Sequence, residues 1–128
     1  MAVVHITLAT RDVLRTRRFF ELACGWTPIR RDSNIPRDAA WLAIAPGQEL
    51  HILEVPDFEP SPYEQEYGRH IALAFPLAEF PALKERLERH GAELIEAQRA
   101  TRFERFFFKD PNGYVFEVVA DDAPPGAD

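Results

Sequence analysis

The chain has 128 residues, 46% of them hydrophobic, and a formal net charge of −6. This length predicts one domain, or two small modules that share a core, and the ten Phe are enough to fill it. The negative charge argues against nucleic acid as the main partner, because phosphate binding needs a basic face, and no apolar run approaches the ~18 residues that span a membrane.

The N-terminus has neither the basic segment nor the apolar segment of a signal peptide. Cys24 is the only cysteine, so no disulfide can form within the chain. We therefore expect a reduced, cytoplasmic setting.

Alternation of side-chain types predicts a first strand over 3–9. Thr10 or Asp12 can cap a helix that runs from there to about Ala23, and Gly25 ends it. The rest of this half is predicted as three further strands. They lie at 27–31, 39–44 and 49–55, with the polar loop 32–38 around Pro36 before the second and the Pro46-Gly47 turn before the third.

Segment 56–68 holds three prolines among several acids, and we interpret it as a linker. The order strand, helix, three strands then begins again. The predicted elements are a strand at 69–75, a helix at about 79–90, a short strand at 93–97, and a hairpin of 103–109 and 114–120. The polar tail 121–128 is expected to be disordered.

The two halves also match in their letters, at an offset of about 65 residues. Residues 5–9 (His-Ile-Thr-Leu-Ala) match 70–74 (His-Ile-Ala-Leu-Ala), and His51 falls on Glu117. We therefore predict an α+β fold of two βαβββ modules. One domain covers 1–120, with the first module at about 1–55 and the second at about 69–120.

Three of the four histidines and one glutamate occupy equivalent positions in the predicted strands: His5, His51, His70 and Glu117. Apolar residues flank them, and side chains alternate across a strand, so these four project away from the helices. A carboxylate in an apolar strand is costly unless it is paired or bound to metal. His and carboxylate ligands suit a first-row divalent ion, which we predict here, with Glu49 as a neighbour of His51. The remaining histidine, His90, lies at a helix C-terminus, where the helix dipole accounts for it.

Three segments resemble the vicinal oxygen chelate superfamily of glyoxalase I, fosfomycin resistance proteins, extradiol dioxygenases, methylmalonyl-CoA epimerase and bleomycin resistance proteins. They are residues 5–9, 68–73 (Gly-Arg-His-Ile-Ala-Leu) and 108–117 (Phe-Lys-Asp-Pro-Asn-Gly-Tyr-Val-Phe-Glu). The resemblance covers roughly 3–120. It implies a cup-shaped mixed β-sheet with outer helices, a small-molecule substrate, a homodimer, and one zinc, nickel, iron(II) or manganese ion held by His5, His51, His70 and Glu117.

The resemblance further implies that the metal chelates two vicinal oxygens of the substrate and acts as a Lewis acid. A glyoxalase-like lyase or isomerase is the favoured function. Bacterial glyoxalase I has Glu at the position of His51, so Glu117 becomes the candidate catalytic base. An extradiol-type iron(II) dioxygenase is one alternative, and a non-catalytic binding protein of the bleomycin resistance type is another.

The resemblance to fosfomycin resistance proteins, which transfer a thiol, includes Thr7 and three of the ligands, His5, His70 and Glu117. The expected lysine and the Ser/Gly-rich potassium loop near 96–102 are absent, however, so we discount true fosfomycin resistance.

Substrate-binding side chains are predicted on the ligand face and in adjacent loops. Thr7, Trp41 and Phe107 share the parity of the ligands, and Arg102 lies in a basic loop that can receive a carboxylate or phosphate. Other residues in or beside such loops are Arg30, Arg99, Arg105, Tyr63 and Tyr67.

Overall fold

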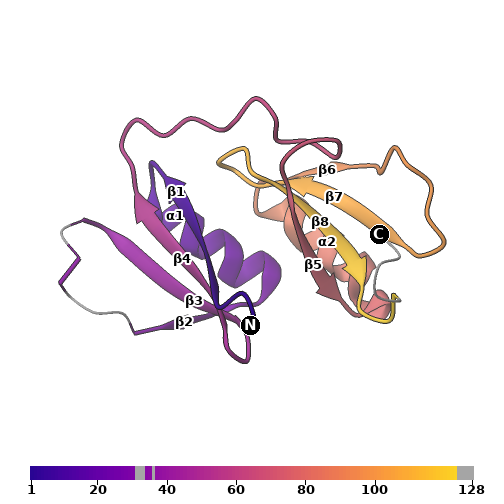
Figure 1. The fold of residues 1–128 in the computed structure, drawn as a ribbon, viewed down its shortest axis with the longest axis horizontal. Helices are drawn as coiled ribbons and strands as arrows, with labels where there is room; N and C mark the ends of the chain where they lie inside the picture. Colours follow the sequence, from indigo (N-terminus) through magenta and orange to yellow (C-terminus); the bar gives the residue numbers. More distant parts are fainter. Residues whose placement is uncertain (31–33, 36, 124–128) are drawn as a thin grey trace. The chain divides into compact units, whose positions relative to one another are not determined.

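The computed structural model describes residues 1–30, 34–35 and 37–123 of the chain. The expectations for Pro36, for part of loop 32–38 and for the end of the tail 121–128 lie outside the described residues. The chain divides into two compact units, Met1–Glu59 and Pro60–Asp128 (Figure 1).

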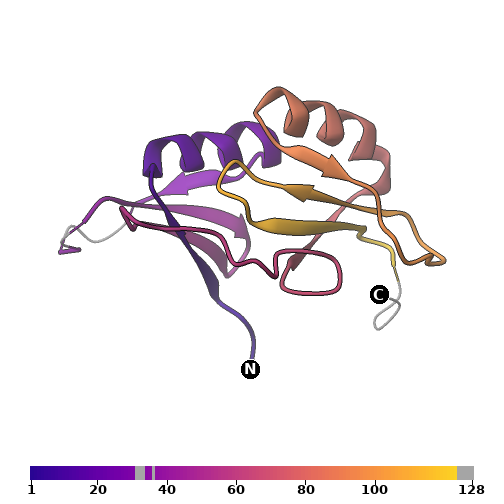
Figure 2. The same cartoon turned by 90° about the horizontal axis from the view of Figure 1, so that it is seen from above.

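The first unit is a four-stranded sheet with a helical segment across one face (Figures 1 and 2). Its elements are β1 (His5–Thr10), α1 (Val13–Phe19), the π-helical turn η1 (Phe20–Cys24), β2 (Thr27–Ile29), β3 (Ala39–Ala45) and β4 (Gln48–Glu54). The strand order is β1-β4-β3-β2, with β1 parallel to β4 and the other pairs antiparallel.

The helical segment begins at Asp12, whose Oδ1 accepts a hydrogen bond from the backbone N–H of Arg15 at 3.0 Å. A single helix to about Ala23 was predicted, but the α-helix ends at Phe19 and one π-helical turn follows. The side-chain pattern does not signal this change, because Phe19 and Ala23 lie on the same buried face of either helix type. Gly25 ends the segment at a φ of 77°, as predicted.

The second unit repeats this arrangement. Its elements are β5 (Ile71–Phe75), the 3-10 turn η2 (Leu77–Glu79), α2 (Phe80–Arg89), β6 (Glu93–Ile95), β7 (Arg105–Lys109) and β8 (Val115–Ala120). The strand order is β5-β8-β7-β6, with β5 parallel to β8. The predicted α+β fold of two βαβββ modules is therefore confirmed, and each predicted strand end lies within about two residues of the observed one. None of the described helices is long and apolar enough to cross a membrane.

Burial separates the two faces of each sheet. In unit 1 the fully buried apolar residues of the strands are Leu8, Leu42, Leu50 and Ile52. They alternate along their strands with Thr7, Trp41 and His51, so the helical segment covers the aliphatic face and leaves the other face free. In unit 2, Leu83 and Leu87 of α2 are fully buried, as the helix prediction required.

The registers of the two sheets are equivalent. His51 pairs with Trp41, and Glu117 pairs with Phe107 at the corresponding place in unit 2. The sequence match therefore reflects equivalent positions in three dimensions.

A buried carboxylate organises the turn between β7 and β8. Asp110 Oδ1 accepts hydrogen bonds from the backbone N–H groups of Asn112 at 3.0 Å and Tyr114 at 2.8 Å. Asp110 is only 3% exposed. Burial raises the pKa of its carboxyl to about 6, and the hydrogen bonds from Tyr114 and Asn112 offset only part of this effect.

This raised pKa predicts a pH dependence of stability. Between pH 4 and 6 the folded chain holds a proton on Asp110 that the unfolded chain, with an ordinary pKa of about 3.9, has released. The stabilisation due to Asp110 therefore falls as pH rises through this window, by up to about 1.4 kcal/mol per pH unit. Urea unfolding of wild type and Asp110→Asn from pH 4 to 7 measures this contribution to the free energy of unfolding. The stability of wild type relative to the variant should fall up to pH 6 and then level off, and a difference that is constant with pH would refute the assignment.

Candidate functional site

One row of side chains crosses the helix-free face of the unit-1 sheet. The register pairs His51 of β4 with Thr7 of β1 and with Trp41 of β3. Paired residues of neighbouring strands project to the same face, so these three predicted site residues are neighbours. His5, two residues before Thr7 on β1, shares that face.

The His51 imidazole lies between two other rings. Its centroid is 4.0 Å from that of His5 at an interplanar angle of 16°, and 4.1 Å from that of Trp41 at 11°. Its Nε2 lies 2.9 Å from Glu49 Oε1, so the predicted neighbour of His51 contacts it directly. Nitrogen lone pairs lie in the plane of the ring, and two nearly parallel planes do not direct them at one point. For His5 and His51 to bind the same ion, one of the two rings would have to turn.

In unit 2 the predicted ligands His70 and Glu117 face each other. His70 Nε2 lies 3.3 Å from Glu117 Oε1, and only 1% of the Glu117 side chain is exposed. His70 immediately precedes β5, and its Nδ1 lies 3.3 Å from the carbonyl oxygen of Gln65. A carbonyl only accepts, so Nδ1 carries a proton and donates it. In the neutral ring this leaves the Nε2 lone pair directed at the carboxylate.

A lone pair and a carboxylate oxygen need a positive charge between them. Either a proton on Nε2 or a metal ion can supply it. Two ligands at about 2.0–2.2 Å from one ion are about 3.0–3.4 Å apart at ordinary coordination angles. The separation of His70 Nε2 and Glu117 Oε1, at 3.3 Å, falls in this range, so the pair fits a divalent ion.

Arg105 is the residue whose role the sequence reasoning missed. It was predicted at the rim of a loop, but its side chain is only 2% exposed and its Nη1 donates to Glu117 Oε2 at 3.1 Å. The signal was available, because Arg105 lies two residues before Phe107 in a predicted strand and so shares the face of Glu117. The Glu117 carboxylate is therefore held at both oxygens, by His70 and by Arg105.

Glu66 extends this ion pair into a network. Its Oε2 accepts from Arg105 Nη2 at 3.0 Å, and its two oxygens accept from the backbone N–H groups of Gln98 at 2.6 Å and Arg99 at 3.0 Å. Burial alone would raise the pKa of Glu66, but the hydrogen bonds from Gln98, Arg99 and Arg105 lower it below the ordinary value. Burial likewise disfavours the charged form of Arg105, yet Glu66 and Glu117 raise its pKa. Both groups therefore stay ionised.

A hollow of about 290 Å³ opens beside this network. Besides Glu117, it is lined by Glu66, Tyr67, His70, Arg99, Arg105 and Phe107. Of the predicted contact residues, four thus line the same hollow as Glu117: Tyr67, Arg99, Arg105 and Phe107.

The remaining predicted contact residues lie elsewhere on the surface. Arg102 and Arg30 are exposed, and so is Tyr63. His90 ends α2, with its backbone N–H donating to Arg86. Within the described ranges, no three His, Cys, Asp or Glu side chains are grouped to hold a metal ion. Of the predicted ligands, His70 and Glu117 therefore form a pair, and a complete site would need further ligands.

Comparisons with known proteins extend over most of the chain. The family model described as Glyoxalase/Bleomycin resistance protein/Dioxygenase superfamily matches residues 2–118. A curated relative, Glyoxylase I 4 of Arabidopsis thaliana, is 25% identical over 125 residues, which are 94% of this chain and 71% of the relative.

Solved structures share the fold. A monoclinic form of the fosfomycin resistance protein FosX from Listeria monocytogenes has a TM-score of 0.76 at 26% identity, over 92% of this chain and 89% of that chain. A mutant of the same FosX complexed with Mn(II) and 1S,2S-dihydroxypropylphosphonic acid has a TM-score of 0.77 at 24% identity, over 93% and 91% of the two chains. A protein of Bacillus anthracis described as of the glyoxalase family has a TM-score of 0.75 at 22% identity, over 94% of each chain.

The Arg105 network predicts a large cost for removing its cation. Arg105→Gln leaves Glu66 and Glu117 buried without a counter-charge, so the free energy of unfolding should fall by about 3–5 kcal/mol. The matched control is Arg89→Gln, which breaks the exposed ion pair with Glu85 and should cost at most about 0.5 kcal/mol. Urea unfolding at pH 7 in metal-free buffer measures both, and equal small losses would contradict the network.

Proposed function

We propose that this chain, which belongs to the glyoxalase/bleomycin resistance protein/dioxygenase superfamily, is a divalent-metal-dependent enzyme that acts on a small molecule with vicinal oxygens. A glyoxalase-like lyase or isomerase is the preferred activity. The observation that carries the proposal is the His70–Glu117 pair, whose Nε2 and Oε1 face each other at 3.3 Å while Gln65 and Arg105 hold their outer atoms.

The proposed ligands are His5, His51, His70 and Glu117. In unit 2 the assignment is supported by the Gln65 carbonyl at His70 Nδ1 and by Arg105, which donates to Glu117 Oε2, because these contacts orient the two side chains. In unit 1, His5 can bind through either ring nitrogen. His51 would have to exchange Glu49 for the ion or bind through Nδ1. When bound, the ion would act as a Lewis acid toward two vicinal oxygens of the substrate.

The chain's own residues would then position the substrate. The Thr7 hydroxyl shares the face of His51 and can hydrogen-bond a substrate oxygen. Trp41 offers a flat apolar surface. Phe107, at the equivalent position of the other sheet, is 1% exposed and lines the hollow beside Glu117. Arg102, exposed in the loop before β7, can receive a carboxylate or phosphate of an anionic substrate.

Two groups could serve as the base that an isomerase needs. Glu117 is the first, provided that its carboxylate can take a proton while Arg105 holds Oε2. Glu49 is the second, because its carboxylate lies beside the proposed ligand His51 and 41% of its side chain is exposed. The likeness to Glyoxylase I 4 of Arabidopsis thaliana supports the isomerase or lyase class.

Specific observations also support two alternative functions. An iron(II) dioxygenase would use two histidines and one carboxylate, a set that His5, His70 and Glu117 can supply. A binding protein without catalysis would need no ion, and protonation of His70 would then account for its contact with Glu117. The FosX complex contains Mn(II) and a phosphonate, which supports a metal-dependent function for this chain. The lysine expected near 96–102 is absent, which argues against fosfomycin as the substrate.

Metal binding is the first test. Protein purified without added metal and then dialysed against nickel, zinc, manganese or iron(II) should take up about one ion per chain. His70→Ala should lower the affinity by at least about tenfold because it removes a ligand, whereas His90→Ala, at the end of α2, should leave it unchanged. Equal effects of the two substitutions would rule out the ligand assignment, and no uptake by wild type would favour the binding protein.

Substrate turnover is the second test. The metal-loaded protein should isomerise a hemithioacetal of methylglyoxal and a thiol, followed by absorbance of the thioester product, and should consume no oxygen with catechols. Oxygen consumption without isomerisation would select the dioxygenase. Inactivity in both assays, with metal bound, would remove both activities.

A further inference from the structure

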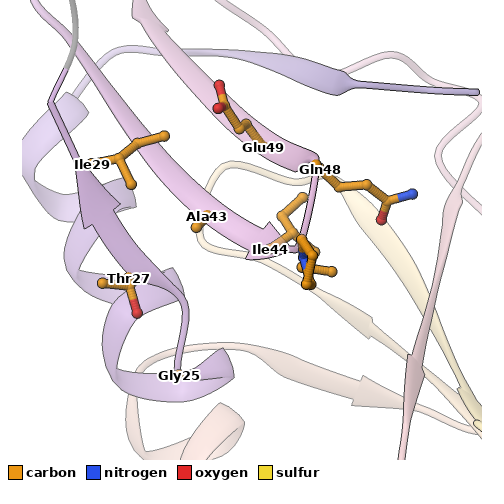
Figure 3. A pocket seen from close by; sticks show the side chains of 10 residues that line it. Gly25, Thr27, Ile29, Ala43, Ile44, Gln48 and Glu49 are labelled. Carbon is orange, nitrogen blue, oxygen red and sulfur yellow. The ribbon is translucent and has the colours of Figure 1, made fainter.

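The helix-free face of the unit-1 sheet contains a hollow of about 420 Å³ that the proposed metal ligands do not line. It lies between β2 and the turn from β3 to β4 (Figure 3). Thr27 and Ile29 border it from β2, Ala43 lies at its base, and Glu49 borders it from β4. Its volume is at the small end of the about 300–1,000 Å³ that small-molecule sites occupy.

The hollow exists because one row of the sheet carries small side chains on β2 and β3. The register pairs Thr27 with Ala43 and Ala43 with Glu49. The neighbouring row, by contrast, carries Ile29, Trp41 and His51. A methyl group between bulky neighbours leaves space above the sheet.

Unit 2 carries a long side chain at the equivalent register position. The residue in the register position of Ala43 is Lys109, which pairs with Glu93 and Val115 as Ala43 pairs with Thr27 and Glu49. A long cationic side chain thus occupies the equivalent place in one unit and is absent from the other. In unit 1 the short side chain of Ala43 instead pairs with a carboxylate, Glu49.

The chemistry of the lining selects the kind of ligand. Among the described residues that border the hollow, Glu49 carries the only charge, and Ile29, Ile44 and Pro46 supply apolar surface. Glu49 Oε1 is engaged by His51, which orients the carboxylate, and no described residue hydrogen-bonds its Oε2. An anion would be repelled here, whereas a cationic N–H donor would gain a charge-assisted hydrogen bond.

We propose that this hollow is a binding subsite for a small organic cation, a short hydrocarbon body that carries a protonated amine and donates to Glu49. The apolar body packs over Ala43 and beside Ile29, and the ammonium group lies at the Glu49 carboxylate. The subsite goes beyond the proposed metal chemistry and does not require the ion. Because Glu49 contacts His51, a ligand bound here lies next to the His51 stack.

The test uses three probes of similar shape and different charge: benzylamine, benzyl alcohol and phenylacetate. Backbone amide NMR at pH 7 on chelator-treated protein should show benzylamine binding with a Kd on the order of 1 mM. The shifts should be confined to residues 25–29 and 43–49. Benzyl alcohol should bind about fivefold more weakly, and phenylacetate should not bind.

Substitutions in and away from the hollow separate binding in the hollow from nonspecific binding. Glu49→Gln should weaken benzylamine about fivefold, to the level of benzyl alcohol. Ala43→Lys should abolish binding of benzylamine and of benzyl alcohol, because it places the lysine of unit 2 in the hollow. If the NMR spectrum of Ala43→Lys shows an unfolded chain, Ala43→Val, which only narrows the hollow, takes its place. Ala78→Lys, on the exposed turn η2, adds the same charge elsewhere and should change nothing.

Two results would overturn the proposal. One is phenylacetate binding as tightly as benzylamine, and the other is Glu49→Gln leaving the benzylamine affinity unchanged. His70→Ala should retain the benzylamine shifts, so failure of the metal site and failure of this subsite give different results.

Discussion

A carboxylate with 1% of its side chain exposed forces its surroundings to supply positive charge. Arg105 does so at one oxygen of Glu117, and His70 faces the other. Burying Arg105 then calls for a second carboxylate, which Glu66 provides, and Glu66 in turn binds the backbone of the loop at Gln98 and Arg99. The need to compensate one charge on β8 therefore fixes a strand, a loop and the segment before β5 in a single network.

The two units carry chemically different side chains at the same position of the sheet. At the position equivalent to Glu117, unit 1 carries His51, an imidazole that need not be charged. Stacking between His5 and Trp41 with one hydrogen bond to Glu49 is enough for it, so no buried arginine is required. A duplicated framework can thus hold a charged network in one half and a ring stack in the other, with the register of the strands unchanged.

The sequence predicted the features that follow from periodicity. Strand alternation and the internal repeat were sufficient to identify the two βαβββ modules and to place His70 on the face of Glu117, and the same parity would have found Arg105. Glu66 could not be found in this way, because it lies in a segment without regular structure whose path no period encodes. The parallel stacking of His5 and His51 was also inaccessible, since parity fixes the face of a side chain but not the angle of its ring.

The Arg105 contact constrains how Glu117 can take part in catalysis. If the carboxylate left its position to move a proton, it would give up the bond to Arg105 and leave a guanidinium that is 2% exposed paired only with Glu66. Losing one partner of a buried ion pair costs several kcal/mol, which would add to the reaction barrier. Glu117 is therefore better suited to the role of a fixed ligand than to that of a mobile base.

Glu49 and His51 carry no such constraint, because Glu49 is 41% exposed and its second oxygen bonds to no described residue. The proton-transfer step of an isomerase is thus compatible with the packing of unit 1 and costly in that of unit 2.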